Sequence, residues 1–500
     1  MHLEDSAGSD YAMTPLSPAL MVCGTTSNAG KTTLVVGLCR ILARRGFSVA
    51  PFKAQNMALN SAVTQSGHEI GRAQFLQAQA AGLEPQVEMN PILLKPADDR
   101  TSQVVVEGLP LGTMSVLEYH KAKPELFKRI MASLNVLRSR YDVVLLEGAG
   151  SPAEINLLDH DIVNLRVAAE AGIPALVVGD INLGGVFAML YGTVALLPSS
   201  LRVLVKAFVI NKFRGDPVLL ADGSEQLERL SGVPTLGVVP MLEDLRLDAE
   251  DSLALTVAPP AKPDAHLDVA MITYPHISNF TDIDPLLGET DVAVRFVRST
   301  RELANPDLIV MPGSKATVSD LTWMRERGLA EAVTASDAVV LGICGGYQML
   351  GTHINDNFES RSGSVAGLNL LDVTTTFEAG KILAQRHGEA FGAPVKGYQI
   401  HHGRVHPTPN TGNQSWLFLD GHPEGYQNGR IMGTTLHGLF DLDEFRHAFL
   451  AHIAQHRGTT FEPHPASFTD HREAEIDRLA DCLEAHLDIA KILDLIGISA

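Results

Sequence analysis

Two short segments contain residues whose types and spacing suit chemistry. The first is Gly24-Thr-Thr-Ser-Asn-Ala-Gly30-Lys31-Thr32-Thr33, which follows a short apolar run and precedes a helical pattern. A glycine before a lysine and a hydroxyl residue lets the backbone curl around phosphate oxygens, which the helix N-terminus then binds. We therefore predict a phosphate-binding loop, with Lys31 at the β- and γ-phosphates of ATP and the Thr32 hydroxyl on Mg²⁺.

The spacing of this loop departs from the strict pattern, which has four residues between its two glycines. Here five residues separate Gly24 from Gly30, and Thr25 occupies the position of the usual first glycine. The alternative is a glycine-containing turn with an exposed lysine, which we disfavour because strand, turn, helix and the Gly-Lys-Thr-Thr sequence occur together. The loop residues predicted to bind ATP are Thr26, Asn28, Ala29, Gly30, Lys31, Thr32 and Thr33.

Two further segments suit a nucleotide site because they follow apolar strand-like runs. Glu147 ends such a run, and a carboxylate at the carboxyl end of a parallel strand lies beside a phosphate loop. We predict that Glu147 joins Thr32 in binding Mg²⁺. Asn211 and Lys212 follow another run and are assigned to ATP, where such a pair can contact the adenine. Solvated turn residues are the alternative for both segments.

The stretch Lys53-Ala-Gln55-Asn56-Met-Ala-Leu-Asn60-Ser61 is unusually rich in amide side chains. It lies after a further strand that we expect between the first helix and residue 53, near the expected position of the γ-phosphate. Lys53, Gln55 and Asn56 therefore suit a polar substrate or an acyl phosphate, although the stretch could instead cap a helix. Asp180 also ends a strand-like run, and we assign it to the same substrate region or to the metal.

The second reactive segment is Gly342-Ile-Cys344-Gly-Gly-Tyr-Gln348, which follows an apolar run. A cysteine between glycines at a sharp strand-to-helix turn is typical of a nucleophile, and the helix N-terminus favours its thiolate. His437, about 90 residues downstream, is the predicted base. Backbone N–H groups of Gly313 and Gly345 are predicted to form an oxyanion hole. A buried structural cysteine is the alternative.

The elements that must position these residues form two series. Strands are expected at 20–23, 143–146, 175–178, 206–210 and 235–239, with a helix over 31–45. A second series, 267–272, 293–297, 308–311 and 338–343, is followed by shorter strands near 397–405 and 433–436. Apolar runs separated by helices indicate parallel sheets covered on both faces. Residues 476, 479, 480 and 483 have helical spacing, which predicts a closing pair of helices.

Composition excludes several classes of protein. The 500 residues favour two to four domains. The 39 basic and 58 acidic residues give a net charge of −19, which argues against a nucleic acid partner. No apolar run is long enough for a membrane span, and the acidic N-terminus is unlike a secretory signal. The four cysteines have neither disulfide nor zinc spacing, so we expect a reducing, cytoplasmic location.

Both halves of the chain resemble known families. Gly342, Cys344, Gly346 and Gln348 match the G-x-C-x-G-x-Q pattern of class I glutamine amidotransferases, and the phosphate loop resembles that of dethiobiotin synthetase and the MinD-like ATPases. Over about residues 19–455 the chain resembles the cobyric acid synthase family. In class I amidotransferases a Glu follows the catalytic His by two residues, whereas Leu439 stands here, so the group that orients His437 is open.

The resemblance implies a two-domain α/β fold: a P-loop NTPase-type parallel sheet with helices on both faces, and a flavodoxin-like amidotransferase domain. We expect a flexible extension over 1–18, an ATP-binding synthetase domain over 19–252, a linker over 253–266, an amidotransferase domain over 267–456 and a helical extension over 457–500. Gly313, Gly345 and Gln348 would then bind glutamine, whose pocket His401 and His402 could also line.

The implied activity is ATP- and Mg²⁺-dependent amidation of four carboxylates of adenosylcobyrinic acid a,c-diamide, with ammonia released from glutamine at Cys344. One alternative is cobyrinic acid a,c-diamide synthase, disfavoured because its 53–61 counterpart is of a Gly-Pro-Asp type. Another is a MinD-like switch with an inert second domain, disfavoured because Cys344 and His437 are both present. The sequence leaves open the oligomeric state, a homodimer included, and the residues that contact the corrin.

Overall fold

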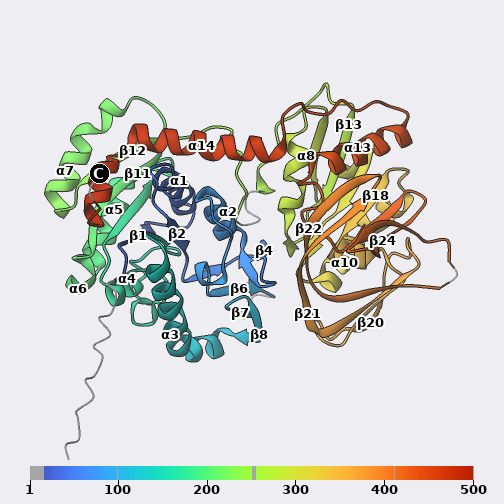
Figure 1. Ribbon diagram of the computed structural model, residues 1–500, viewed down its shortest axis with the longest axis horizontal. Coiled ribbons are helices and arrows are strands. Elements are labelled where there is room, and N and C mark those ends of the chain that lie inside the picture. Colours follow the sequence, from blue (N-terminus) through green and yellow to red (C-terminus); the bar gives the residue numbers. More distant parts are fainter. Residues whose placement is uncertain (1–15, 98–99, 251–254, 410, 499–500) are drawn as a thin grey trace, which may run out of the picture.

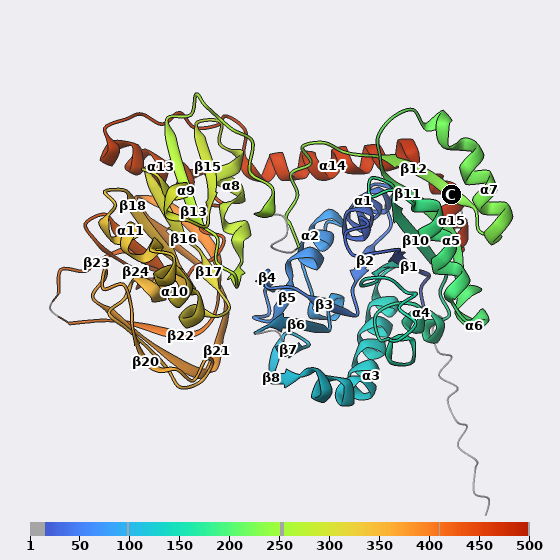
Figure 2. The same ribbon diagram turned by 180° about the vertical axis from the view of Figure 1, so that it is seen from behind.

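The computed structural model describes residues 16–97, 100–250, 255–409 and 411–498. Two α/β lobes lie side by side, and the long helix α14 (Phe468–His486) crosses between them in both views (Figures 1 and 2). Among the described helices, none combines the length and apolar character that a bilayer crossing needs. The predicted N-terminal extension lies outside the described residues as far as residue 15, as do residues 253 and 254 of the predicted linker.

The first lobe contains a parallel sheet of six strands in the described chain, in the order β12-β11-β10-β1-β9-β2. Alternate residues of β1 enter opposite cores: Met21 and Cys23 pack with α3, while Leu20 and Val22 pack with α1. Since both faces are covered, nearly every strand position is apolar, and the predicted fold class is confirmed. The strands are β1 (Ala19–Gly24), β2 (Val49–Phe52), β9 (Val143–Glu147), β10 (Ala175–Asp180), β11 (Val205–Phe213) and β12 (Thr235–Pro240).

Helices connect the strands of this lobe, and a smaller sheet is inserted after β2. In the inserted sheet β3 pairs in parallel with β6, and β7 and β8 continue it antiparallel. A separate hairpin, β4–β5, faces the second lobe. The inserted strands are β3 (Gln55–Met57), β4 (Ser61–Val63), β5 (Glu69–Gly71), β6 (Ile92–Pro96), β7 (Thr101–Val106) and β8 (Leu109–Ser115). The helices are α1 (Lys31–Arg44), α2 (Arg72–Ala80), α3 (Val116–Arg140), α4 (Leu165–Ala171), α5 (Val186–Leu196) and α7 (Ala221–Ser231), with the short α6 (Ser199–Arg202) after α5.

The second lobe has a mixed sheet whose parallel half, β15-β13-β16-β18-β25, continues into antiparallel strands. Cys344 follows the central strand β18, which is buried between its neighbours. The strands are β13 (Leu267–Ile272), β15 (Val292–Val297), β16 (Leu308–Met311), β18 (Val339–Ile343), β19 (His353–Asp356), β20 (Gly363–Ala366), β23 (Gln414–Leu419), β24 (His422–Asn428) and β25 (Ile431–Thr434), and β14 (Ile277–Ser278) pairs with β17 (Gly313–Ser314). The helices are α8 (Asp284–Gly288), α9 (Thr300–Leu303), α10 (Thr317–Glu326), α11 (Leu329–Ala335), α12 (Gly345–Leu350) and α13 (Asp443–Arg457).

The antiparallel half differs from the short strands expected near residue 400. It contains a long hairpin made of β21 (Val373–Ala390, 18 residues) and β22 (Ala393–Pro407, 15 residues). The buried positions of β22 include Gln399, His401 and His402, which are polar. Hydropathy therefore underestimates the length of this strand, because part of its buried face lines a polar site and not an apolar core.

The C-terminal helices complete the first lobe. Leu479 and Leu483 of α14, together with α15 (Ile489–Leu495), belong to the same apolar core as α1. The fit is close: a Cβ at Gly37 of α1 would lie 2.3 Å from Cδ1 of Leu483. The chain thus enters the second lobe and returns to cover the first sheet.

Replacing Leu479 by Ala should destabilise the first lobe. The side chain is 1 % exposed, and removing such a leucine costs about 2–5 kcal/mol through lost burial and the cavity left behind. Urea denaturation followed by circular dichroism measures this loss. Asp481→Ala, on the exposed side of the same helix, is the control and should cost less than about 1 kcal/mol. Equal effects of the two variants would show that α14 does not contribute to this core.

Candidate active sites

The predicted phosphate loop leaves the carboxyl end of β1 and leads into α1. Gly30 has φ 97°, a left-handed conformation that side chains with a Cβ rarely adopt. A Cβ there would also lie 2.0 Å from Nδ2 of Asn211. That amide donates to the carbonyl of Ala29 at 3.0 Å. Conformation and space therefore both require glycine, and Asn211 supports the loop from β11.

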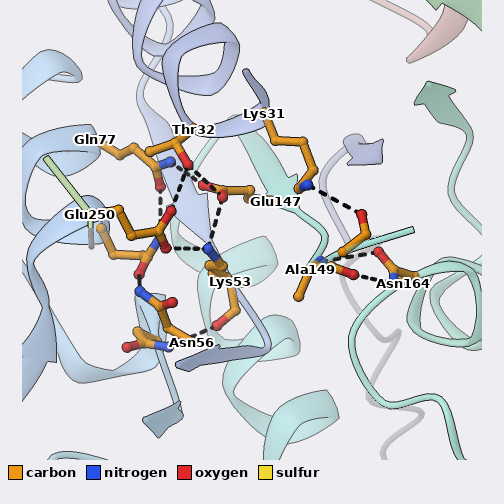
Figure 3. A network of polar contacts seen from close by, with 12 residues as sticks. Lys31, Thr32, Lys53, Asn56, Gln77, Glu147, Ala149, Asn164 and Glu250 are labelled. Atoms are coloured by element: carbon orange, nitrogen blue, oxygen red, sulfur yellow. Dashed lines mark hydrogen bonds and ion pairs between the residues drawn. The ribbon is translucent and has the colours of Figure 1, made fainter. Parts of the chain in front are cut away.

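Lys31 is buried at the first position of α1. Its Nζ donates to the carbonyl oxygens of Thr26 at 2.9 Å and Gly150 at 3.2 Å. Figure 3 shows the lysine reaching toward the segment that follows Glu147. Burial lowers the pKa of Lys31, while the nearby Glu147 carboxylate raises it. Both of these partners are neutral carbonyls, so an anionic phosphate could replace them at a gain in electrostatic energy.

A cluster of charged groups faces the loop from the ends of β2 and β9 (Figure 3). The Thr32 hydroxyl donates to Glu147 at 2.8 Å and to Glu250 at 3.0 Å. Lys53 Nζ contacts the same two carboxylates at 2.8 and 2.5 Å. Gln77 donates to the second oxygen of Glu147 at 2.6 Å. Burial lowers the pKa of Lys53, but the carboxylates of Glu147 and Glu250 raise it by more, so the pKa lies above its ordinary value.

The donors in this cluster fit magnesium. Thr32, Glu147 and Glu250 offer oxygen atoms, the ligands that Mg²⁺ prefers in proteins. Within the described residues, no group of three or more His, Cys, Asp or Glu side chains gathers as a metal site. A site with so few protein ligands suits a magnesium ion that also keeps waters and phosphate oxygens. Glu250 was not predicted from the sequence.

The remaining predicted residues of this lobe divide into two groups. Lys212 donates to the Asn28 carbonyl at 2.6 Å and pairs with Asp180 at 2.8 Å, so Asp180 lies on the Asn28 side of the loop. The second group, Gln55 and Asn56, lines a cavity of about 890 Å³, which Lys31, Lys53, Glu147 and Lys212 also line. This volume lies in the usual range for ligand pockets, about 300–1,000 Å³.

In the second lobe, Cys344 occupies the turn between β18 and α12. Its φ of 51° and ψ of −104° lie outside the ordinary regions for a residue with a side chain. The Cys344 N–H donates to the Thr434 carbonyl at 2.8 Å, which ties the turn to the neighbouring strand β25. A strained residue held in place by its surroundings is typical of an active site.

His437 is held by a carboxylate that sequence analysis did not find. Asp282 contacts Nδ1 of His437 at 2.7 Å, and its other oxygen accepts the Gly438 N–H at 2.8 Å. Burial lowers the pKa of His437, but Asp282 and the Cys344 side chain together raise it to about 10. The carboxylate thus occupies Nδ1, which leaves the other ring nitrogen for the contact with the Cys344 side chain. Asp282 supplies the orienting group that Leu439 cannot.

The predicted oxyanion and glutamine residues pack around the same turn. A Cβ at Gly313 would lie 3.0 Å from Cε1 of His437, and a Cβ at Gly345 would lie 2.6 Å from the Ser314 nitrogen. Gln348 is buried and accepts the Thr317 hydroxyl at 3.1 Å. The glycines therefore allow two strand ends to meet beside Cys344, where backbone N–H groups can face a developing oxyanion.

A small cavity of about 40 Å³ beside Cys344 has a cationic lining drawn from both lobes. Lys381 and Lys95 both bind the buried Glu69 carboxylate, at 2.5 and 2.7 Å. Lys315 pairs with Glu359, and burial lowers the pKa of Lys315 to about 7. The predicted His401 and His402 line the same cavity. Since Lys95 and Glu69 belong to the first lobe, this site is completed across the interface.

Replacing Asp282 by Asn should lower the activity of Cys344 and shift its pH dependence. Asp282 raises the pKa of His437, so its loss lets the ring lose its proton at lower pH. The alkaline limb of the glutamine hydrolysis profile should therefore move to lower pH, with kcat/KM reduced about 10²-fold or more. Asp284→Asn is the matched control, because burial raises the pKa of that nearby carboxyl and Asp284 is not among the groups that raise the pKa of His437. An unchanged profile would remove Asp282 from the catalytic group.

Comparisons with known proteins agree with this geometry. Residues 20–254 match the model of the CobQ/CobB/MinD/ParA nucleotide binding domain, and residues 268–445 match that of the CobB/CobQ-like glutamine amidotransferase domain. The chain is 51% identical to the cobyric acid synthase of Rhodococcus jostii, covering 96% of both chains. It is 48% identical to that of Mycolicibacterium paratuberculosis and 50% identical to that of Streptomyces coelicolor, each over 96% of this chain and 97% of the relative. The chain therefore belongs to the cobyric acid synthase family of glutamine-dependent amidoligases.

Proposed function

We propose that this chain converts adenosylcobyrinic acid a,c-diamide into cobyric acid by four ATP-dependent amidations that use nitrogen from glutamine. The observation that carries the proposal is the presence of two different reactive sites in one chain. Cys344, His437 and Asp282 form a nucleophile with its base, and Lys31, Thr32 and Glu147 line a cavity of about 890 Å³. The first site releases ammonia, and the second activates a carboxylate to accept it.

The glutaminase step uses Cys344 as nucleophile. Its Sγ attacks the side-chain amide carbon of glutamine, and His437 donates the proton that lets ammonia leave. Water then attacks the thioester carbon with His437 as base, which releases glutamate and restores the thiol. The N–H groups of Gly313 and Gly345 are proposed to stabilise the oxyanion in both steps.

The synthetase step makes a carboxylate reactive. A carboxylate oxygen of the corrinoid attacks the γ-phosphorus of ATP, ADP leaves, and an acyl phosphate forms. Ammonia then attacks the acyl carbon and phosphate leaves. Lys31 and Lys53 are proposed to stabilise the negative charge of the phosphoryl oxygens. Thr32, Glu147 and Glu250 would hold Mg²⁺, which supplies further neutralisation of phosphate charge when bound.

Two other functions make different predictions. A cobyrinic acid a,c-diamide synthase would amidate other carboxylates, and the 53–61 stretch of this chain differs from the Gly-Pro-Asp type of that relative. A MinD-like switch would hydrolyse ATP without amidating anything. The proposed function also includes the cytoplasmic location expected from the four cysteines, which are free thiols in the structure.

Mass spectrometry of the corrinoid separates these functions. After incubation with ATP, Mg²⁺ and glutamine, adenosylcobyrinic acid a,c-diamide should gain four amides. Adenosylcobyrinic acid without the two amides is the control acceptor, and preferential conversion of that acceptor would favour the diamide synthase. No turnover of either corrinoid would contradict the proposal.

Two variants should separate the reactive sites. Cys344→Ser should abolish glutamine-dependent amidation but keep amidation with ammonium salts, because the synthetase site is intact. Lys31→Ala should abolish amidation with either nitrogen source, because a cation at the transferring phosphoryl group is lost. Product is measured by mass spectrometry with each source. Glutamine-dependent activity in Cys344→Ser, or full activity in Lys31→Ala, would contradict these assignments.

Replacing Glu147 by Gln should weaken binding of the metal. The variant loses one of the two carboxylates that face Thr32, so the Mg²⁺ concentration for half-maximal activity should rise about tenfold or more. Electron paramagnetic resonance of Mn²⁺ with ATP measures the same loss without turnover. Glu154→Gln is the control, since Glu154 lines the same cavity but is exposed. Equal Mn²⁺ affinity in the two variants would exclude Glu147 as a ligand.

A further inference from the structure

The amide-rich stretch that begins at Lys53 spans the distance between the two reactive sites. At one end, Lys53 contacts Glu147 and Glu250 beside the phosphate loop. At the other end, Ser61 opens β4, which faces the second lobe. Asn60 donates to the carbonyl of Ala249 at 3.1 Å, which is the residue before Glu250. The stretch is therefore attached to the phosphate site at both Lys53 and Asn60.

Two side chains of the second lobe bind the backbone of Ser61. Asn279 donates to the Ser61 carbonyl at 3.0 Å and accepts the Ser61 N–H at 3.4 Å. The Tyr398 hydroxyl donates to the same carbonyl at 3.0 Å and accepts from Asn279 at 3.0 Å. All three residues are buried. These polar groups are satisfied only when the two lobes keep this register.

The same two residues support the catalytic histidine, Tyr398 through its ring and backbone and Asn279 through its backbone. The Tyr398 ring stacks on the His437 ring, with centroids 5.5 Å apart and planes 25° apart. Their backbones also pair, with N···O distances of 3.0 and 2.9 Å. Asn279, at φ 52°, begins the turn that carries Asp282, and the Asp282 N–H donates to the Asn279 carbonyl at 3.1 Å. Both the ring and the carboxylate that orient His437 are thus fixed against Ser61.

We propose that Tyr398 and Asn279 are positioning residues for the glutaminase, and that Ser61 sets their placement according to the state of the phosphate site. This inference rests on the proposed function, since it requires glutamine hydrolysis at Cys344. A nucleotide that rearranges Lys53 or Glu250 would move the Asn60–Ser61 backbone, because the contacts between them are continuous. Glutamine hydrolysis would then respond to ATP and to the carboxylate acceptor.

The test measures glutamine hydrolysis by the full-length chain, with and without ATP, Mg²⁺ and adenosylcobyrinic acid a,c-diamide. Tyr398→Phe keeps the ring that stacks on His437 and removes only the hydroxyl that binds Ser61. We expect kcat for hydrolysis to fall about two- to tenfold, the range for one lost buried hydrogen bond, with KM for glutamine unchanged. Stimulation by ATP and acceptor should disappear, whereas amidation with ammonium salts should match the wild type.

A second variant and a control distinguish the loss of these contacts from a general loss of folding. Asn279→Gly removes the amide but accepts the positive φ, and it should lose the same stimulation. Tyr274→Phe is the control, because Tyr274 is also buried in the second lobe and its hydroxyl has no hydrogen-bond partner among the residues that the structure describes. Thermal midpoints of all variants show whether they fold.

Three results would overturn the inference. In the first, ATP and acceptor do not change the rate at which the wild type hydrolyses glutamine. In the second, they still stimulate hydrolysis in both Tyr398→Phe and Asn279→Gly. In the third, these variants lose ammonia-dependent amidation to the same extent as glutamine hydrolysis. The last result would indicate a purely structural contact. Failure of the proposed function looks different: the wild type would not amidate the corrinoid even with ammonia, while ATP could still change the hydrolysis of glutamine.

Discussion

Both reactive sites depend on a sharp turn between the end of a buried parallel strand and the start of a helix. At Gly30 and Cys344 the backbone adopts φ values of 97° and 51°, and α1 or α12 begins at the next residue. Glycine tolerates this conformation, whereas a residue with a Cβ bears a cost of about 1–3 kcal/mol. The neighbouring strands offset that cost at Cys344, where β25 accepts its N–H. The strain places the sulfur at the strand end, where His437 can reach it.

The interface between the lobes is specified by buried charges as well as by shape. Glu69 of the first lobe binds Lys95 of its own lobe and Lys381 of the other. Burial raises the pKa of Glu69, but the two ammonium groups lower it by more and hold it well below its usual range. Removing one partner from a buried ion pair costs about 3–5 kcal/mol, so a shifted register is strongly disfavoured. The contacts of Ser61 with Asn279 and Tyr398 require the same register.

Patterns local in sequence predicted the fold class, the phosphate loop and the cysteine turn, because strand, turn and helix signals stood next to the reactive residues. Asp282 could not be found in this way, since it lies 155 residues before His437 and outside any recognised motif. Glu250 is likewise 218 residues from Thr32. A polar residue shortly after a strand, such as Asp282 after β13, is the weak signal that was available. Tyr398 was hidden because β22 buries polar groups and lacks an apolar period.

The return of α14 and α15 to the first lobe bears on how the chain folds during synthesis. The face of the first sheet that α1 covers shares its apolar core with Leu479 and Leu483, which the ribosome makes after the whole second lobe. Until then, the apolar surface of α1 and β12 against which α14 packs stays open to water and to other chains. A nascent or truncated chain that lacks α14 should therefore be prone to aggregate and to bind chaperones, even though the nucleotide loop is already complete.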